Sequence, residues 1–408
     1  MQRIFVFLAL IAAGVLVSCG SEGPTSSDVR VLEGDVTIRT QADLDALVSR
    51  GGDAFKITGG LLIDGSPLTT LEGLRNLTGV EAGLFIDSNP ALTNLEGINN
   101  LSISGDLFIG NNAALTSLAA LSNLTHVING EMLIDSNPAL KSLEGLHNLA
   151  SIAGSLTIDT NTGLTTLEGL RSLTSVGGDL LIANNAALTT LEGLRNLTGA
   201  GGFLQLDNNA VLTTLEGLRN FENLGGDLVI VEHDALTTLN GLNGITRLEG
   251  IMLIGTNPLL TSLEGVNNLT SIAEDILIAN NVALASLAGL DNLTSIGGGL
   301  GIDSNVALMT LAGLNSLTSI GGDLGITKNF ALMTLAGLDS LTSIGGDLGI
   351  SNNAALTSLE GINNLTSVGG NLILTGNTTL PTSSCQALAD RLAAGGFNGQ
   401  VSITGNLP

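Results

Sequence analysis

The chain has 408 residues, of which 44% are hydrophobic and 12% charged, and its formal net charge at pH 7 is −24. This apolar content excludes a disordered chain, which lacks the residues to form a core. The charge argues against partners that are nucleic acids or anionic membrane faces, because a strongly acidic surface repels them. Cationic peptides and divalent ions stay open as ligands, and the charge also keeps a leucine-rich protein soluble.

The N-terminus has the order of segments of a secretory signal peptide. Arg3 precedes an apolar run over residues 4–17, which is too short to span a bilayer. The sequence LVSC at residues 16–19 resembles the lipobox of bacterial lipoproteins. That resemblance implies lipid attachment at Cys19 and an extracytoplasmic, membrane-anchored location at the outer membrane or the cell surface. An ordinary signal peptide with an incidental cysteine is the alternative.

A polar stretch follows this signal. Residues 20–28 (GSEGPTSSD) are rich in Gly, Ser and Pro, which is typical of a flexible tether. We therefore expect a signal peptide over residues 1–18, a tether over residues 19–30, and one repeat domain over residues 31–408.

The rest of the chain repeats itself. Each repeat contains an L-x-I pair whose second apolar residue serves as an anchor, and from residue 134 to residue 374 the anchors are 24 residues apart. Chance cannot hold this register, and a fixed period is typical of a solenoid. The sixteen anchors are Ile38, Ile63, Ile86, Ile109, Ile134, Ile158, Ile182, Leu206, Ile230, Ile254, Ile278, Ile302, Ile326, Ile350, Leu374 and Ile403.

The alternation in L-x-I predicts a β-strand in every repeat. Around one anchor, Leu180 and Ile182 should point inward and Leu181 outward. Helix is disfavoured in the rest of the repeat because Gly and Thr recur there. The pair Gly177 and Gly178 should mark a corner with unusual backbone angles.

One repeat cannot bury its own apolar face, so stacked repeats must share a continuous core. The predicted fold class is therefore all-β, a right-handed solenoid of stacked coils of about 24 residues, with short helical caps at both ends. At the first end, Thr40 and Asp43 have the spacing of a capping box for a helix near residues 41–50.

At the other end, Ser383 or Ser384 could begin a second capping helix near residues 384–394. Cys385 would lie on the apolar side of this helix. We expect it to be a small buried residue and not a reactive thiol.

A polar column stands three residues after the anchors. A side-chain amide both donates and accepts, so stacked amides can satisfy backbone groups that a corner leaves unpaired. We expect this column to be a structural ladder, with His233 as a substitute turn residue. The ladder consists of Asn89, Asn112, Asn137, Asn161, Asn185, Asn209, Asn257, Asn281, Asn305, Asn329, Asn353 and Asn377, with Asn406 in the last coil.

The repeat resembles two related families. Residues 180–185 match the L-x-L-x-x-N core of the leucine-rich repeat. The closer resemblance is to the receptor L-domain, the ligand-binding solenoid of growth-factor and insulin receptors, whose coils are of similar length and whose ends are closed by helices. This chain is longer, more regular and without disulfides, and in that it is more similar to bacterial surface proteins built from such repeats. The resemblance covers residues 31–408 and implies binding, but it names no ligand.

No catalytic arrangement is visible in the sequence. His126, His147 and His233 occupy different columns, and neither a Ser/His/Asp set nor metal-ligand spacing occurs. We therefore expect no catalytic residue, no metal and no cofactor. A polysaccharide-active enzyme on a β-helix is the least favoured alternative.

Two acidic columns could bind Ca²⁺, but we favour solvated charge that is partly compensated by Arg75, Arg171, Arg195 and Arg219, each three residues after a Glu of the first column. The Glu column comprises Glu72, Glu96, Glu144, Glu168, Glu192, Glu216, Glu264 and Glu360. The Asp column comprises Asp64, Asp87, Asp135, Asp159, Asp207 and Asp303.

The outward position of L-x-I is the candidate partner surface. Outward strand positions are normally polar, and exposed apolar rows mark interaction sites. We therefore expect a non-catalytic cell-surface lipoprotein that acts as a binding or adhesion scaffold for a protein or surface ligand. It would contact the membrane through the lipid anchor, and nucleic acid would not be among its partners. The alternative function is a structural envelope spacer without a specific ligand. The row consists of Leu62, Phe85, Phe108, Leu133, Leu181, Val229, Leu253 and Leu277, and it changes to glycine at Gly301, Gly325 and Gly349.

Overall fold

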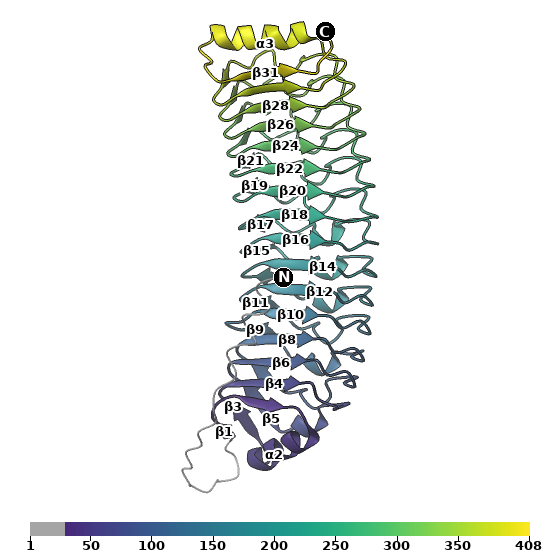
Figure 1. Cartoon of the computed structure of the whole chain (residues 1–408). Coiled ribbons are helices and arrows are strands. Elements are labelled where there is room, and N and C mark those ends of the chain that lie inside the picture. Colours follow the sequence, from purple (N-terminus) through teal and green to yellow (C-terminus); the bar gives the residue numbers. More distant parts are fainter. Residues whose placement is uncertain (1–28) are drawn as a thin grey trace.

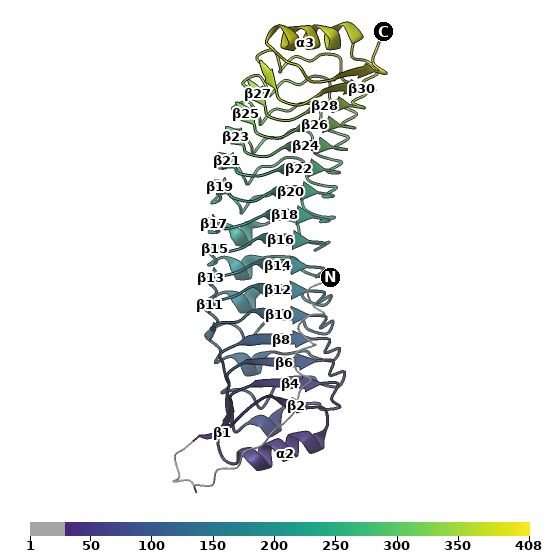
Figure 2. The same cartoon turned by 60° about the vertical axis from the view of Figure 1, so that its left-hand side comes forward.

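The computed structural model describes residues 29–408. The predicted signal peptide, the lipid attachment at Cys19 and most of the tether lie outside these residues. The described chain winds into a gently curved rod of stacked parallel coils, with one helix at each end (Figures 1 and 2). The predicted solenoid is confirmed, because every pair of neighbouring strands in the rod is parallel.

One long sheet carries all of the anchors. Its sixteen strands follow one another in chain order, and each anchor pairs with the next, as Ile158 does with Ile182. The strands are β2 (Val36–Ile38), β4 (Gly60–Asp64), β6 (Gly83–Asp87), β8 (Asp106–Gly110), β10 (Met132–Asp135), β12 (Leu156–Asp159), β14 (Leu180–Ala183), β16 (Leu204–Asp207), β18 (Leu228–Val231), β20 (Met252–Gly255), β22 (Ile276–Ala279), β24 (Leu300–Asp303), β26 (Leu324–Thr327), β28 (Leu348–Ser351), β30 (Leu372–Thr375) and β31 (Val401–Thr404).

A second wall of short strands precedes the main sheet in every coil except the last, where α3 (Thr382–Ala394) precedes β31. It divides into three parallel sheets. The first contains β1 (Arg30–Leu32), β3 (Phe55–Ile57), β5 (Leu77–Val80) and β7 (Ser102–Ile103). The second contains β9 (His126–Val127), β11 (Ser151–Ile152), β13 (Ser175–Val176), β15 (Gly199–Ala200) and β17 (Asn223–Leu224). The third contains β19 (Arg247–Leu248), β21 (Ser271–Ile272), β23 (Ser295–Ile296), β25 (Ser319–Ile320), β27 (Ser343–Ile344) and β29 (Ser367–Val368).

The core runs along the whole rod between these walls. Leu180 and Ile182 have no exposed surface, while Leu181 between them is half-buried on the outer side. The leucines that recur every three residues after the strand, such as Leu188 and Leu191, are also buried. Each coil therefore buries its apolar face against its neighbours, as the period predicts.

The sharp corner of the coil lies directly after the main strand. Asn184 has a φ of 54° and Thr256 a φ of 56°, in the left-handed region that costs a side-chain-bearing residue about 1–2 kcal/mol. Gly177 and Gly178 have no positive φ, so the prediction of unusual backbone angles there is wrong. Glycine is favoured at Gly177 because coils approach closely there, and a Cβ on this backbone would collide with the carbonyl oxygen of Ala153 in the previous coil. Coils with Ala153, Glu249 or Ala273 at the same place accommodate a side chain.

The wall after this corner takes one of two forms. In the coils of one form it contains a 3₁₀ turn, and in the coils of the other a glycine has a φ between 109° and 122°. The 3₁₀ turns are η1 (Glu72–Leu74), η2 (Ala119–Leu121), η3 (Glu168–Leu170), η4 (Glu192–Leu194) and η5 (Glu216–Leu218). The positive-φ glycines are Gly97, Gly145, Gly241, Gly265, Gly289, Gly313, Gly337 and Gly361.

Helices cover both ends of the core. The first is α2 (Gln41–Gly51), where Thr40 and Asp43 form the predicted capping box and Leu44 and Leu47 are buried. Figure 1 shows this helix and the second, α3, at opposite ends of the rod. Of the helices that the structure describes, none is long and apolar enough to span a membrane.

The second helix, α3 (Thr382–Ala394), begins earlier than predicted. Pro381 precedes it and no side chain caps it, so the proposed start at Ser383 or Ser384 is wrong. Proline suits a helix start because its fixed φ and its missing N–H cost nothing there. Cys385 is a free and fully buried thiol whose pKa is raised by burial.

Candidate binding surfaces

The candidate partner surface lies on the outer face of the main sheet. Seven of its eight residues are half-buried, and Leu277 is 42% exposed. The strand register places these residues next to one another in two blocks. Leu181 belongs to neither block, because Thr157 and Gln205 occupy the outward positions on its two sides. The first block is Leu62, Phe85, Phe108 and Leu133, and the second is Val229, Leu253 and Leu277.

The two phenylalanines of the first block are half-buried because their rings cover glycines. A Cβ on Gly110 would collide with the Phe108 ring, and one on Gly83 would lie 3.0 Å from the Phe85 ring. Phe85 and Phe108 are also directly paired in the sheet. The first block is therefore an apolar strip of side chains that lie on the sheet with part of each ring open to solvent.

Towards the C-terminus the same row becomes bare backbone. A Cβ on Gly301 would lie 2.9 Å from the Cδ1 atom of Leu277, but one on Gly325 would have no neighbour within 4 Å and one on Gly349 would have only a carbonyl oxygen at 3.9 Å. None of the three has a positive φ. Neither backbone angle nor packing thus requires glycine at Gly325 and Gly349.

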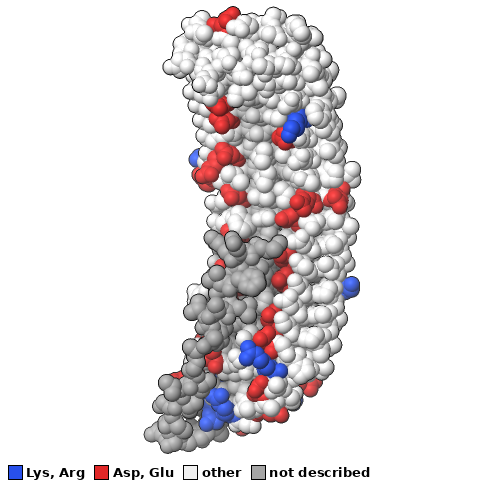
Figure 3. Space-filling model, viewed as in Figure 1, with Lys and Arg blue, Asp and Glu red and all other residues white. Residues whose placement is uncertain are grey.

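The Asp column stands beside this row at the ends of the strands. Asp135 and Asp159 are paired in register, and burial raises the pKa of Asp135, with the repulsion of Asp159 and Asp87 adding to it. Burial also raises the pKa of Asp207. Hydroxyl and amide donors offset part of this cost, since the Ser136 hydroxyl donates to Asp135 and the Gln205 amide donates to Asp207. Figure 3 shows acidic side chains in a file along the lower half of this face.

No group of three or more His, Cys, Asp or Glu residues is placed to hold a metal within residues 29–408. The three histidines are not brought together. His126 contacts Ser151 on the second wall, with its Nδ1 atom 2.7 Å from the Oγ atom, and His147 is half-buried on the wall after the corner. His233 is fully buried in the asparagine ladder.

The arginines pair with the Glu column between coils and not within a coil. Arg195 lies 3.4 Å from Glu168, and Arg219 lies 3.1 Å from Glu192, in each case the Glu of the previous coil. Arg75 and Arg171 form no salt bridge within the described residues. These exposed pairs contribute little to stability.

The asparagine column is buried and joins coil to coil. The backbone N–H of Asn161 donates to the Oδ1 atom of Asn185 at 3.1 Å, and its Nδ2 atom donates to the carbonyl oxygen of Ile134 at 2.8 Å. Other members repeat both bonds, as Asn281 and Asn305 do. Because these amides use their donors and acceptors within the rod, none is free for a ligand.

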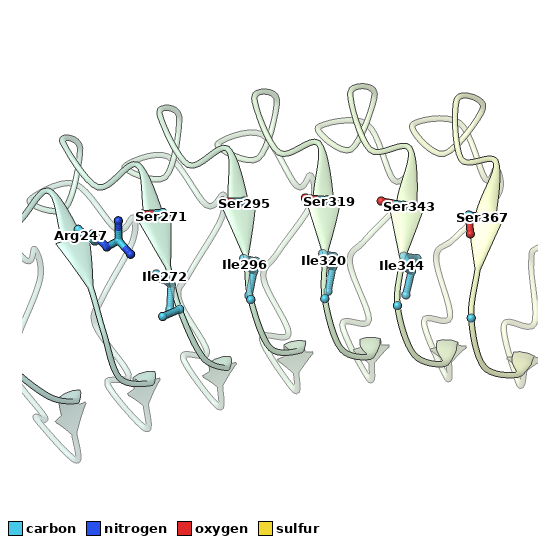
Figure 4. Close-up of a pocket in the computed structure, with 15 residues that line it drawn as sticks. Arg247, Ser271, Ile272, Ser295, Ile296, Ser319, Ile320, Ser343, Ile344 and Ser367 are labelled. Carbon is cyan, nitrogen blue, oxygen red and sulfur yellow. The ribbon is translucent and has the colours of Figure 1, made fainter.

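A shallow groove runs along the third sheet of the second wall. Figure 4 shows its serines and isoleucines in two stacked files, with Arg247 at one end. The groove is lined by the same Ser-Ile pair in each of the strands β21, β23, β25 and β27, and none of these strands contributes a different residue type. This groove therefore does not select a ligand by its chemistry. Its serines are Ser271, Ser295, Ser319, Ser343 and Ser367.

A second exposed apolar set was missed in the sequence, and we call it the turn patch. It lies on the wall after the corner, in the coils with anchors 254 to 326, and is separate from the outward row. Its members are Leu259, Val282, Val306, Met309, Phe330 and Met333. The available signal was the replacement of the usual Thr, as at Thr189 and Thr213, by Met309 and Met333 in two successive coils.

No family model matches this chain, and no curated protein sequence matches it. Among solved structures, the chain is similar to an internalin from Listeria monocytogenes at 15% sequence identity and a TM-score of 0.33. That alignment covers 88% of this chain and 92% of the internalin chain.

Proposed function

We propose that this protein is a non-catalytic binding or adhesion scaffold at the cell surface. The observation that carries the proposal is the contrast between the inner and outer positions of the main sheet. Inward positions hold nearly the same large aliphatic residues from coil to coil, and from β4 to β30 all of them are buried. The outward positions between them vary in blocks, from the aromatic pair Phe85 and Phe108 to the bare backbone at Gly325 and Gly349.

This variation favours a scaffold over a structural spacer. A spacer needs only that coils stack, so its outward positions should be polar and uniform along the rod. Here the first block places apolar side chains on solvent-facing strand positions, where they add no burial to the core. Such surfaces are typical of sites where another molecule docks.

The proposal includes attachment to the membrane through lipid on Cys19, at the outer membrane or the cell surface. The LVSC sequence at residues 16–19 supports it. Replacement of Cys19 by Ser should release the chain from the membrane fraction into the soluble extracytoplasmic fraction. Retention of the Cys19→Ser chain in the membrane fraction would contradict a lipid anchor.

Binding is tested with a surface variant that leaves the core intact. The sheet-row variant carries Phe85→Ser, Phe108→Ser and Leu133→Ser, and its control carries Thr→Ser at the exposed Thr189, Thr213 and Thr237. The purified wild-type and control chains should bind isolated cell envelopes of the source organism alike, and the sheet-row variant should bind about tenfold more weakly, a loss of about 1.4 kcal/mol. Equal binding by all three folded chains would refute the proposal.

A further inference from the structure

The turn patch concentrates exposed apolar side chains in one part of the rod. Its members are between 39% (Val306) and 51% (Leu259) exposed, and together they make up nearly half of the large hydrophobic residues that are exposed within residues 29–408. Phe330, Met309 and Met333 are each 50% exposed. Scattered exposed apolar residues are ordinary, whereas a contiguous group marks an interaction site.

Backbone hydrogen bonds show that the patch is contiguous. Val282, Val306 and Phe330 each follow a ladder asparagine, and these asparagines bond coil to coil at 3.0–3.1 Å. The three side chains therefore lie about 4.8 Å apart, which is the spacing of stacked strands. The column that contains Met309 and Met333 is also joined between coils, since the Met309 N–H donates to the carbonyl oxygen of Ala285 at 3.2 Å and the Thr357 N–H donates to that of Met333 at 3.0 Å.

The fold does not require these residues. At the position of Phe330 other coils have small residues such as Ala186, and at the position of Met333 they have threonine such as Thr189. In the coils of Val282, Val306 and Phe330 the Glu column is replaced by Ala288, Ala312 and Ala336. Large apolar residues thus appear in successive coils where the Glu column is interrupted.

The coils that carry the patch are acidic. Residues 240–365 contain ten Asp and Glu residues against two cations, Arg247 and Lys328, and Arg247 pairs with Glu249 at 2.8 Å. The exposed Glu264 and Glu360 continue the Glu column on the two sides of the alanines. A second copy of this chain would bring the same excess of negative charge to the interface, which opposes association.

We propose that the turn patch binds an amphipathic protein segment whose apolar residues cover the patch and whose Lys or Arg residues lie at both ends, near Glu264 and Glu360. This inference rests on the proposed function as a binding scaffold, and it names a second surface and its partner class. Apolar contact supplies affinity, and the acidic flanks select the orientation and speed the encounter. Added salt should weaken binding because the flanking charges are exposed.

The test uses the full chain and two synthetic fluorescent peptides. Both peptides have the same amphipathic Leu- and Phe-containing centre; one has Lys at both ends and its twin has Glu. The patch variant carries Val306→Ala, Met309→Thr, Phe330→Ala and Met333→Thr, which are residues that other coils of this chain already have at these positions. The sheet-row variant serves as the matched control, because it alters the other apolar surface.

We expect the Lys-flanked peptide to bind wild type and the sheet-row variant alike, to bind the patch variant at least about tenfold more weakly, and to lose affinity in added salt. The Glu-flanked peptide should not bind. Equal binding of both peptides, or full binding to the patch variant, would overturn the inference. So would a wild-type dimer that the patch variant abolishes, because the occupant would then be a second copy. If the sheet-row variant lost binding to cell envelopes while neither peptide bound the wild-type chain, the proposed function would stand and this inference alone would be refuted.

Discussion

Among single residues, the ladder asparagines bond coil to coil inside the corner, and His233 interrupts them. Its backbone N–H donates to the Oδ1 atom of Asn257, but neither ring nitrogen has a hydrogen-bond partner. Both nitrogens are fully buried. A buried polar atom without a partner costs about 1–3 kcal/mol. His233 is therefore a weak point in a column that is otherwise satisfied.

Replacing His233 with Asn should stabilise the rod. The new amide can repeat the two bonds of its neighbours, one to Asn257 and one to the carbonyl oxygen of Leu206 in the previous coil, so the gain should be about 1–2 kcal/mol. The midpoint of urea unfolding at pH 8 measures it. A lower midpoint for His233→Asn would show that the ring is better packed than its unsatisfied nitrogens indicate.

The same residue makes stability depend on pH. Burial lowers the pKa of His233 from 6.5 to about 4, so between these values the unfolded chain binds a proton there and the folded chain does not. The stability of the wild type relative to His233→Asn should therefore fall as the pH is lowered from 6.5 to about 4, by up to about 3 kcal/mol, and should be constant above 6.5. Unfolding midpoints across this range would contradict the account if the two proteins changed in parallel.

Glycine has two different roles, and substitution separates them. Gly177→Ala should destabilise the protein by about 1–3 kcal/mol, the usual cost of overpacking, because the new Cβ meets the Ala153 carbonyl oxygen and the backbone must shift. Gly325→Ala should be neutral or stabilising by about 0.5–1 kcal/mol, because its Cβ meets nothing and alanine loses less entropy. Thermal unfolding of the two variants compares them. Similar losses in both would mean that the glycine row of the main sheet is structurally required.

At the scale of the elements, the wall after the corner takes its glycine form or its 3₁₀ form according to the side chain two residues after the glycine. In five coils with a positive-φ glycine, its N–H donates to an Asn or Asp oxygen two residues later, as Gly289 does to Asp291 at 3.0 Å. Coils with a 3₁₀ turn have Arg or Ser at that place, as at Arg195. The glycine form also turns a carbonyl group towards the previous coil, where the Leu287 N–H donates to the carbonyl oxygen of Ala312 at 2.9 Å.

Loss of that acceptor should loosen the turn. Asp291→Ala should lower stability by about 1 kcal/mol, the usual worth of one such hydrogen bond, and should speed hydrogen exchange at the Gly289 amide. Asp291→Asn keeps the acceptor and should restore both properties. Unchanged exchange at Gly289 in Asp291→Ala would show that the coil contacts alone hold the glycine in its conformation.

The periodicity was sufficient to predict the main strands, because a 24-residue register assigns every anchor to the same place and every anchor is found in one sheet. Gly177 and Gly178 do lie at a bend between the two walls, as predicted, but their φ values are not positive, because the close approach of stacked coils and not the backbone angle favours glycine there. The left-handed corner falls on Asn184 and on its counterparts in other coils. Asparagine favours that region, but the same place holds Thr256, Glu232 and Lys328 in other coils, so the column does not stand out in the sequence. The turn patch was missed for a related reason: its columns are adjacent only across coils.

At the scale of the whole molecule, each coil contacts its two neighbours through the main sheet, the core and the ladder. Both ends are covered by helices, which protect the last core layers from solvent. Outward side chains take little part in these contacts, so they can vary. The formal net charge of −24 at pH 7 opposes association between rods and favours basic partners.

The central claim is that a coil depends only on its neighbours and leaves its outward side chains for binding. Deletion of residues 159–182, which joins Ile158 to Ala183, tests it directly. Small-angle X-ray scattering should show a folded rod of unchanged cross-section whose length is shorter by about 4.8 Å, the spacing of one strand. A collapsed or unfolded chain, or a rod with a changed cross-section, would contradict the account.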